Sequence, residues 1–579
     1  MKNQELAKIF SQLAQYLAMR DIPFKPQAYE RAGFAIESLS EDVQDIYKRE
    51  GLAGLENIPG VGKGIAERIE EYLKTGHIKD YEKERRHMPV DLDELASVEG
   101  IGPKAIAELY KRLKVKNLKD LKQAAQAGKI RKLPRFGLKT EQNILQGIEL
   151  AKRSSGRWLL GSIFPYVEEY VALLKNSSFA REVVPAGSFR RMRETVGDID
   201  ILATSKKPQK LIDFFIANVK YKKLWGKGST KVSLRTEYGF DIDLRVLPEE
   251  TFGAGLQYFT GSKEHNVKLR TLAITKGYKV SEYGVFSAKR GRRVACRTEE
   301  DVYRVLGLPY IEPELREDTG EIEAALQQAR GKSPGLPKVI PYDSLKGDLQ
   351  VQTNWTDGEH SIEEMAKEAK LRGLSYIAIT DHTRDLVMTG GSDEKKLLRQ
   401  MKEIDRVNKK ISGITVLKGA EVNIRKDGSL DITDKMLAKL DIVGASVHSH
   451  FKLSKKDMTL RIVRAMKNPH VDILFHPTGR LIKKREPYDV DMEALITAAK
   501  KTGTLLEINA FPERLDLKDA DIRKAVEMGV KLVIDSDAHQ KEHFSVLRYG
   551  IAQARRGWAE AKDVMNTLPL TAFRKKLKR

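Results

Sequence analysis

Apolar residues recur at two spacings along the chain, and each spacing predicts a different kind of element. Near the N-terminus they follow the i, i+3, i+4, i+7 spacing of an amphipathic helix. These residues are Leu6, Ile9, Phe10, Leu13 and Leu17. Residues 199–202 and 240–247 instead alternate apolar and polar side chains, which is typical of half-buried strands. The pattern predicts a helical N-terminal region followed by mixed α/β structure.

The C-terminal part of the chain contains short apolar runs that each end in a side chain able to bind metal. The runs are residues 376–380 before Asp381 and His382, 416–420 before Glu421, 442–447 before His448, 473–475 before His476, and 532–534 before Asp535, Asp537 and His539. Such side chains at successive strand ends describe the active face of an α/β barrel. A single buried histidine is more often structural, but five such strand ends are hard to explain by packing.

Length and charge then limit the class of protein. At 579 residues the chain is too long for one core, and its formal net charge of +22 suits a polyanion such as nucleic acid. Cys296 is the single cysteine, which rules out disulfides within the chain and thiolate zinc sites. The N-terminus reads as neither a signal peptide nor a membrane span, and no amphipathic basic anchor favours a membrane. We expect a cytoplasmic monomer.

Two carboxylates form the most informative motif. Asp198 and Asp200 are two residues apart on a predicted strand, so both side chains point the same way and favour Mg²⁺ or Mn²⁺. Upstream, Gly187-Ser188 leads into a segment with three arginines, which can donate to phosphates. These arginines are Arg190, Arg191 and Arg193. A second acidic pair, Asp241 and Asp243, follows on a later predicted strand and offers a third ligand.

This order of motifs resembles the nucleotidyltransferase superfamily, and specifically the family X DNA polymerases. The resemblance implies Asp198, Asp200 and Asp243 as catalytic ligands of two divalent ions, with Asp243 favoured by the D-L-R-V-L-P sequence. It further implies nucleotide-binding residues, with Ser188 and Arg191 on the β and γ phosphates, a Tyr-Phe-Gly turn on the sugar, and an Asn and Arg at the minor groove. These residues are Gly187, Ser188, Arg191, Tyr258, Phe259, Gly261, Asn266 and Arg270.

Two glycine hairpins interrupt the helical N-terminal region. Each resembles a helix-hairpin-helix, in which glycines let the backbone approach a DNA phosphate and the next helix receives it on its N–H groups. The residues concerned are Gly60, Gly62 and Lys63 in the first hairpin, and Gly100, Gly102 and Lys104 in the second. One hairpin alone could be an ordinary turn, but two predict sequence-independent DNA binding.

The first hairpin also resembles the lyase domain of some animal family members, in which a lysine forms a Schiff base with an abasic sugar. The matching position here is Arg68. A guanidinium stays protonated and cannot act as the amine nucleophile. Lys63 or another lysine could substitute, but nothing in the sequence selects one. We therefore expect DNA anchoring here and no lyase chemistry.

The C-terminal motifs resemble the polymerase and histidinol phosphatase (PHP) domain, a distorted (β/α)₇ barrel with three metals in its typical form. The implied ligands are Asp357, His382, Glu421, His448, His476, Asp537 and His539. The family's H-x-H pair is replaced by Gln350 and Gln352. An amide oxygen is a poor ligand for zinc or manganese compared with imidazole. One metal would then keep only Glu421 and Asp537, so we expect two Mn²⁺ or Zn²⁺ ions rather than three.

The other two metals would each keep three ligands. These sets are Glu421, His448 and His476 for one metal, and Asp357, His382 and His539 for the other. We expect His450 and Asp535 only to shape the site. Residues 330–338, rich in proline, glycine and charge, read as a linker before this domain.

The predicted fold is multidomain α/β, with a helix-hairpin-helix region, a nucleotidyltransferase palm and a PHP barrel. The predicted boundaries are 1–85 for the N-terminal helical DNA-binding domain, 86–150 for the second hairpin subdomain, 151–250 for the palm, 251–318 for the nucleotide-binding thumb, 319–340 for a linker, 341–570 for the PHP domain and 571–579 for a basic tail.

The resemblance implies a template-directed DNA polymerase that uses dNTPs to fill short gaps, as in base excision repair. Its barrel would be of the 3′-5′ exonuclease and abasic-site endonuclease type, weakened by the two glutamines. One alternative is a DNA-binding repair scaffold whose nuclease has decayed, which the glutamines make credible for the barrel but the intact palm does not. Another is a nucleotidyltransferase acting on tRNA or antibiotics, against which the paired hairpins and the Tyr258-to-Ser262 turn argue.

Overall fold

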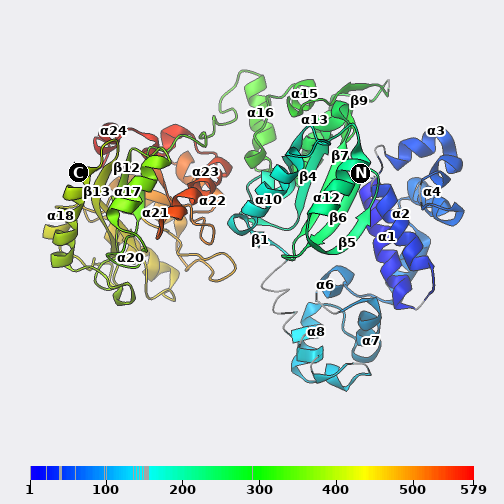
Figure 1. The fold of residues 1–579 in the computed structure, drawn as a ribbon, viewed down its shortest axis with the longest axis horizontal. Coiled ribbons are helices and arrows are strands. Elements are labelled where there is room, and N and C mark those ends of the chain that lie inside the picture. Colours follow the sequence, from blue (N-terminus) through cyan, green and yellow to red (C-terminus); the bar gives the residue numbers. More distant parts are fainter. Residues whose placement is uncertain are drawn as a thin grey trace. The chain divides into compact units, whose positions relative to one another are not determined.

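A computed structural model describes residues 2–578 apart from 21, 38, 40, 41, 59, 97, 99, 100, 135, 139, 143, 146, 147, 149–155 and 290. The chain forms two compact units (Figure 1). The first comprises Met1–Trp158, Pro165–Arg190 and Thr195–Tyr310, and the second comprises Leu159–Phe164, Arg191–Glu194 and Ile311–Arg579. No helix in the described ranges is both long and apolar enough to cross a membrane.

The N-terminal region is helical, as the apolar spacing predicts. Its helices are α1 (Lys2–Met19), α2 (Lys25–Glu37), α3 (Val43–Glu56), α4 (Lys63–Thr75), α5 (Lys79–His87), α6 (Leu92–Ala96), α7 (Pro103–Leu113), α8 (Leu118–Gln126) and the 3₁₀ turn η1 (Ile130–Lys132). They build two separate apolar cores. Phe10 and Ile69 lie in the first core, and Ile106 and Leu121 lie in the second. Each core supports one of the two glycine hairpins.

The palm is a mixed sheet with the strand order β2-β4-β7-β6-β5. Its elements are β1 (Trp158–Leu159), α10 (Leu160–Lys175), β2 (Val183–Pro185), α11 (Gly187–Arg190), β3 (Thr195–Val196), β4 (Ile199–Thr204), α12 (Pro208–Asn218), β5 (Tyr221–Lys227), β6 (Lys231–Thr236) and β7 (Asp241–Leu247). β4 and β7 are parallel, whereas β6 is antiparallel to both of its neighbours. β7 alternates between buried and half-buried residues, which matches the predicted alternation.

The thumb follows directly. Its elements are η2 (Glu249–Thr251), α13 (Phe252–Thr260), α14 (Lys263–Thr275), β8 (Tyr278–Ser281), β9 (Gly284–Ser287), β10 (Arg293–Ala295) and α15 (Glu299–Val305). The predicted Tyr-Phe-Gly turn begins inside α13, which runs to Thr260, and the chain turns only at Gly261, where φ is +69°. Asn266 and Arg270 lie in α14, as predicted.

The barrel strands are all parallel and follow one another in sequence order from β11 to β17. They are β11 (Gly347–Val351), β12 (Tyr376–Ile379), β13 (Thr415–Asn423), β14 (Ile442–Ser446), β15 (Ile473–Leu474), β16 (Leu505–Asn509) and β17 (Leu532–Asp535). A bridge between Val351 and Ala538 nearly closes the sheet. β13 continues past Ala420, where the sequence predicted its end, because Glu421 and Asn423 still pair with β14.

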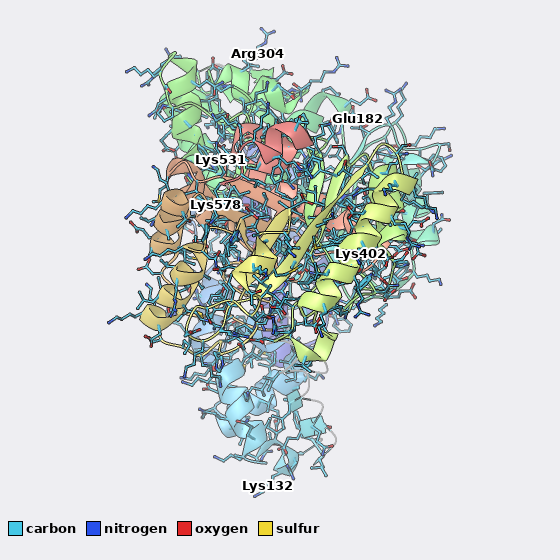
Figure 2. The ribbon with its side chains drawn as sticks, turned by 90° about the vertical axis from the view of Figure 1, so that its left-hand side faces the viewer. Lys132, Glu182, Arg304, Lys402, Lys531 and Lys578 are labelled. Atoms are coloured by element: carbon cyan, nitrogen blue, oxygen red, sulfur yellow. The ribbon has the colours of Figure 1, made fainter. Side chains whose placement is uncertain are left out.

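Helices and 3₁₀ turns connect the strands and complete the second unit. They are η3 (Pro313–Leu315), α16 (Glu321–Ala329), α17 (Ile362–Leu371), η4 (Val387–Thr389), α18 (Glu394–Lys410), α19 (Asp434–Leu437), α20 (Lys455–Met466), α21 (Met492–Thr502), α22 (Asp519–Glu527), η5 (Lys541–Val546), α23 (Leu547–Arg556), η6 (Ala561–Asp563), η7 (Met565–Thr567) and α24 (Leu570–Arg574). α18 packs Leu397 and Ile404 inward, while Lys402 is exposed on its outer side (Figure 2).

Candidate active sites

The predicted palm carboxylates lie on two neighbouring strands. β4 and β7 run parallel, and their register pairs Asp200 directly with Asp243. Asp198 lies two residues before Asp200, just ahead of β4, and alternation turns both carboxylates toward one face. The structure therefore brings these three carboxylates to the same face of the sheet.

Burial and mutual repulsion raise the pKa of two of these carboxyl groups. Burial, together with the charges of Asp198 and Asp243, raises the pKa of Asp200 to about 8. Burial and the charge of Asp243 also raise the pKa of Asp198. Crowded carboxylates of this kind favour a cation between them, and hard oxygen ligands suit Mg²⁺ or Mn²⁺. The palm residues therefore fit divalent metal.

Two basic side chains of the sheet keep Asp243 charged. Lys231 Nζ on β6 lies 3.1 Å from Asp243 Oδ2, and Arg245 Nη2 on β7 lies 4.0 Å from the same oxygen. Burial opposes ionisation of Asp243, but Lys231 and Arg245 outweigh it and lower its pKa. Within the described residues the palm carboxylates do not form a group with all ligand atoms within 4.8 Å. Asp243 Oδ2 faces Lys231 instead.

Gly187 has a steric reason to be glycine. It follows β2 at the start of α11, with φ at +62°, which disfavours other residues. A Cβ at this position would lie 2.6 Å from Asp200 Oδ2. The backbone before Ser188 therefore approaches the Asp200 carboxylate more closely than any side chain would allow.

The arginines after Ser188 have protein partners. Arg190 donates to Glu299 at 2.9 and 2.5 Å and to Thr260 at 2.7 Å, so it fastens α11 to the thumb. Arg191 Nε donates to Glu317 at 3.0 Å, within the second unit. Burial lowers the pKa of Arg191, and Glu317 opposes that shift. Arg191 would have to exchange Glu317 for a phosphate in order to bind a nucleotide.

Hydrogen bonds connect the predicted nucleotide-binding residues of the thumb. Asn266 Nδ2 donates to the carbonyl of Tyr258 at 2.7 Å, and Asn266 Oδ1 accepts from Gln257 Nε2 at 2.8 Å. Arg270 Nε donates to the carbonyl of Asn266 at 3.1 Å. The Arg245 guanidinium lies 4.7 Å from the ring centre of Phe259 and so connects the Asp243 strand to α13.

Each of the two glycine hairpins leads into a helix whose N-terminus has no neighbouring protein atoms, among the described residues, at the preceding glycine. Gly62 precedes α4 and Gly102 precedes α7, and neither helix has a side-chain cap. A Cβ on either glycine would meet no atom within 4 Å. Lys63 and Lys104 are exposed in the first turns of these helices. Gly60 has φ at +83°.

Gly100, predicted to contact DNA, lies outside the described residues. At the position matching the lyase lysine, Arg68 donates to Asp80 at 3.1 and 2.8 Å. The hydrogen bond to Asp80 also raises the pKa of Arg68. A paired guanidinium agrees with a hairpin that holds DNA without lyase chemistry.

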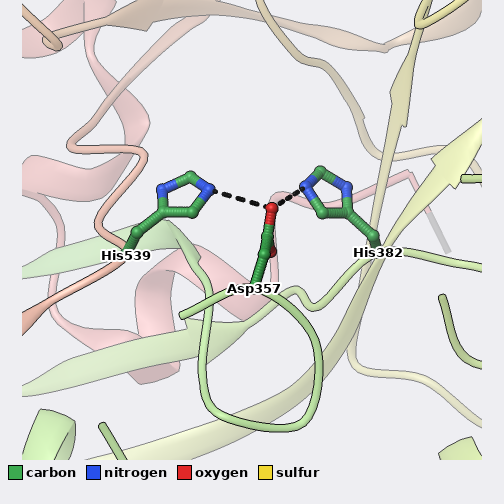
Figure 3. A group of neighbouring side chains, drawn as sticks. All are labelled: Asp357, His382 and His539. Atoms are coloured by element: carbon green, nitrogen blue, oxygen red, sulfur yellow. Dashed lines mark ion pairs between the residues drawn. The ribbon is translucent and has the colours of Figure 1, made fainter. Parts of the chain in front are cut away.

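In the barrel, one group of metal-type side chains centres on Asp357. Its Oδ2 lies 3.5 Å from His382 Nε2 and 3.6 Å from His539 Nε2 (Figure 3). Burial lowers the pKa of both histidines, but Asp357 and neighbouring carboxylates outweigh it and raise each to about 9. The three ligand atoms lie within 4.8 Å of one another. This group fits a divalent metal such as Mn²⁺ or Zn²⁺.

A second group surrounds Glu421. His448 Nε2 and His476 Nε2 lie 3.2 and 2.9 Å from Glu421 Oε1, and His382 Nδ1 lies 3.4 Å from Oε2. Burial would raise the pKa of Glu421, but the histidines lower it well below its ordinary value. His382, Glu421 and His448 form the compact group here, so His382 faces both candidate metal positions.

The two glutamines are buried among the remaining predicted ligands. Gln352 Nε2 donates to Glu421 Oε2 at 2.8 Å. Asn509 Nδ2 donates to Gln350 Oε1 at 3.1 Å and to Asp537 Oδ2 at 3.2 Å. Arg514 Nε lies 3.4 Å from the same Asp537 oxygen. Amide and guanidinium N–H groups therefore surround the carboxylates that a third ion would need, and these residues do not fit that ion.

Other barrel residues position the ligands, and the sequence did not single them out. Asn423 Oδ1 lies 2.7 Å from His448 Nδ1, and Ser446 Oγ donates to Glu421 at 2.5 Å. Asp381 accepts from Thr353 and Thr356 in the turn that carries Asp357. The only feature of the sequence that could have indicated these positioning residues is that they lie near strand ends.

The two residues expected only to shape the site also lie at strand ends. Asp535 accepts from the backbone N–H of Leu349 at 2.7 Å, which connects β17 to β11. His450 is exposed, with φ at +55°. The expectation that these two residues only shape the site stays a prediction.

Comparison with known proteins gives four family matches. They are DNA polymerase beta thumb at residues 255–317, PHP domain at 348–511, a helix-hairpin-helix domain at 1–78 and a SAM-like helix-hairpin-helix tandem at 92–149. Over 582 residues, covering 100% of both chains, the sequence is 37% identical to DNA polymerase/3′-5′ exonuclease PolX of Bacillus subtilis (strain 168).

Shorter matches involve proteins named as probable phosphatases. One from Thermoanaerobacter sp. (strain X514) is 37% identical over 208 residues, which is 34% of this chain and 80% of that protein. Another from Caldanaerobacter subterraneus subsp. tengcongensis is 36% identical over 189 residues, covering 31% of this chain and 70% of that protein.

Proposed function

This chain belongs to the family X DNA polymerases that carry a C-terminal PHP domain, and we propose that it fills short gaps during base excision repair. It is a DNA-directed DNA polymerase whose partners are DNA and dNTPs. The observation that carries the proposal is the parallel register that sets Asp200 beside Asp243, with Asp198 on the same face. We propose that it acts as a cytoplasmic monomer.

In the palm, Asp198, Asp200 and Asp243 would hold Mg²⁺ or Mn²⁺. Bound there, the metal would lower the pKa of the primer 3′-hydroxyl and neutralise charge on the triphosphate and leaving pyrophosphate. Lys231 keeps Asp243 ionised and positioned before substrate arrives. Gly187 leaves the space in which the backbone passes Asp200.

Around these ligands, other residues would bind the substrates. Ser188 and Arg191 would bind the β and γ phosphates, Tyr258 and Phe259 would pack on the sugar, and Gly261 would allow their turn. Asn266 and Arg270 would contact the minor groove around the new pair. At the hairpins, α4 and α7 would receive backbone phosphates on their free N–H groups, with Lys63 and Lys104 adding charge.

For the barrel, we propose a 3′-5′ exonuclease and abasic-site endonuclease of reduced activity with two ions, Mn²⁺ or Zn²⁺. Imidazoles and carboxylates are present for two metals, whereas Gln350, Gln352 and Arg514 surround the place of the third. The same contacts favour a second candidate function for this domain, a folded DNA-positioning scaffold with a silent nuclease.

A primer-extension assay on gapped DNA tests both activities. The full chain is incubated with a 5′-labelled primer, with and without dNTPs, in Mg²⁺ and in Mn²⁺, and the labelled products are resolved by length. We expect gap filling with dNTPs and little shortening without them. DNA binding without extension in either metal would favour the scaffold over the polymerase.

A further inference from the structure

The outer face of α18 carries a continuous row of basic side chains. They are Lys395, Arg399, Lys402, Arg406 and Lys409. Their spacings of four, three, four and three residues bring all five within an arc of about 80° around the helix axis. This group is called the basic row below.

The basic row faces solvent. The buried side of α18 is formed by Leu397, Gln400, Ile404 and Val407. All five basic residues are exposed, and Figure 2 labels Lys402 among them. The apolar side of α18 is already packed into the barrel apart from Leu398, which is 38% exposed, and one leucine does not make an apolar face that could insert into a membrane. The basic row therefore presents charge without an apolar companion surface.

Neighbouring cations of α18 have protein partners, whereas the basic row mostly does not. Lys396 Nζ donates to the carbonyl of Gly390 at 2.7 Å, and Lys410 Nζ lies 2.8 Å from Glu363. Within the basic row, among the described residues, only Arg406 has a carboxylate within 4.0 Å, at 3.7 Å in Glu403. A solvated helix face usually interleaves acids with bases. Here the acidic residues of α18 fall outside the arc.

We propose that the basic row binds the backbone of duplex DNA. It spans about 21 Å along the helix, a length over which a duplex carries about twelve phosphate charges. Contacts of this kind are independent of sequence, as a repair enzyme requires. The inference rests on the proposed DNA-binding function and adds a binding surface on the barrel itself.

The position of α18 in the barrel gives this surface a use. α18 follows the loop after β12, and His382 lies at the start of that loop. A helix after a barrel strand begins at the end where the strand's ligands lie. The basic row therefore starts at the metal-ligand end and runs away from it. A duplex bound along it would lead toward the candidate metal groups.

The test removes charge from the basic row in the full-length chain. One variant carries K395Q, R399Q, K402Q and K409Q, which keep good helix formers on an exposed face. A matched variant carries K435Q, K439Q, K500Q and K501Q, exposed lysines elsewhere on the barrel surface. Both lose the same charge. Affinity for a gapped duplex with long arms is measured by fluorescence anisotropy across a series of salt concentrations.

We expect the basic-row variant to bind about tenfold more weakly. The slope of log affinity against log salt concentration should become about three to four less steep, since each phosphate contact contributes about 0.9 to that slope. The matched variant should keep the wild-type slope. Equal slopes in the two variants would overturn the inference. A wild-type chain that does not bind gapped DNA would instead overturn the proposed function.

Cross-linking provides a second measurement. The chain has one cysteine, Cys296, and it is buried, so K402C introduces one accessible thiol. DNA whose backbone phosphates carry a tether ending in an activated disulfide should exchange with the K402C thiol, releasing the small leaving thiol, and should not do so with K500C. Equal cross-linking at both positions would contradict a specific surface on α18.

Discussion

The palm and the barrel both gather carboxylates for metal, but they balance the charge differently. In the palm, Asp198 and Asp200 have raised pKa values because they are buried and because carboxylates face carboxylates. In the barrel, histidines surround Glu421 and lower its pKa. Asp198 and Asp200 therefore face mainly other carboxylates, which favours an added cation, whereas Glu421 and Asp357 in the barrel already have histidines beside them.

This difference bears on how each site tolerates change. We expect that an amide cannot replace Asp198, Asp200 or Asp243, because charge is what these three residues would supply to a metal. In the barrel, Gln352 donates to Glu421 and Asn509 donates to Asp537, so amides satisfy carboxylates without metal. A barrel of this kind can lose one metal site and keep its packing.

The largest expected effect comes from the palm. D200N or D243N should reduce nucleotide incorporation about a thousandfold or more, because removing a metal ligand costs several kcal/mol of transition-state stabilisation. Binding of gapped DNA should persist, since the hairpins and basic surface hold it. Single-turnover extension and anisotropy are measured on the same preparations.

D241N is the matched control for these variants. Asp241 lies two residues before Asp243 on β7 but is held by Arg235 at 2.9 Å through both oxygens. It should extend primers at close to the wild-type rate. Wild-type extension by D200N or D243N would remove the contrast between palm and barrel.

The second prediction concerns variants in which the histidine pair of the barrel is restored. Q350H combined with Q352H should raise Mn²⁺-dependent degradation of a 3′ end about a hundredfold, since a third ion adds a charge clamp. Bound manganese per chain should rise from two to three among the barrel sites. Q350A combined with Q352A adds no ligand, so it should raise neither the rate of 3′-end degradation nor the bound manganese per chain.

Robust nuclease in the unaltered chain would contradict this reasoning if H476A abolished it and the double restoration left it unchanged. The barrel would then work without the missing pair. Counting ligands would be the wrong guide to its activity.

A smaller effect is expected from the crowding around Asp200. G187A should slow incorporation about tenfold, because a Cβ in this left-handed conformation is strained and meets Asp200 Oδ2. G64A on α4 is the control, since a Cβ there meets nothing within 4 Å. Equal rates for G187A and wild type would show that Asp200 can shift without loss.

The smallest effect concerns the metal-free barrel and pH. His382 and His539 have pKa values of about 9, raised above the ordinary value of about 6.5. Their stabilisation is fully present below about pH 6.5 and is lost as pH rises through about 9, a difference of about 1–3 kcal/mol. Thermal unfolding in EDTA should therefore occur at lower temperature at pH 9 than at pH 6.

D357N tests the cause of that dependence, because it removes the charge shared by the two histidines. Its unfolding temperature should vary less with pH than that of the wild type. An unchanged pH dependence would assign the effect to other groups.

Local motifs predicted much of the molecule. The helical spacing, each glycine hairpin and the Asp198-Asp200 pair are each contained in a short stretch of sequence, and each histidine follows closely on its own strand. Each depends on backbone geometry that short sequences specify. The architecture of hairpin domains, palm and barrel followed from their order, and the family matches confirm it.

Long-range pairings could not be predicted in this way. Lys231 reaches Asp243 only because of the β6–β7 register, which alternation does not fix. Gln352 and Glu421 are 69 positions apart, so their hydrogen bond needs the closed barrel. The partners of Arg190 and Arg191 are likewise distant in sequence, and they show that basic residues near a phosphate motif can serve packing.

The sequential order of the barrel strands has a genetic consequence. The metal-type side chains come from separate strands and the loops after them, so the end of β11 alone determines whether the H-x-H pair is present. A glutamine codon differs from a histidine codon only at its third base. Two third-base changes in the codons at the end of β11 would therefore restore the H-x-H pair of the third metal site. Descendants of such a gene could gain or lose a nuclease while the other six β-strands are inherited unaltered.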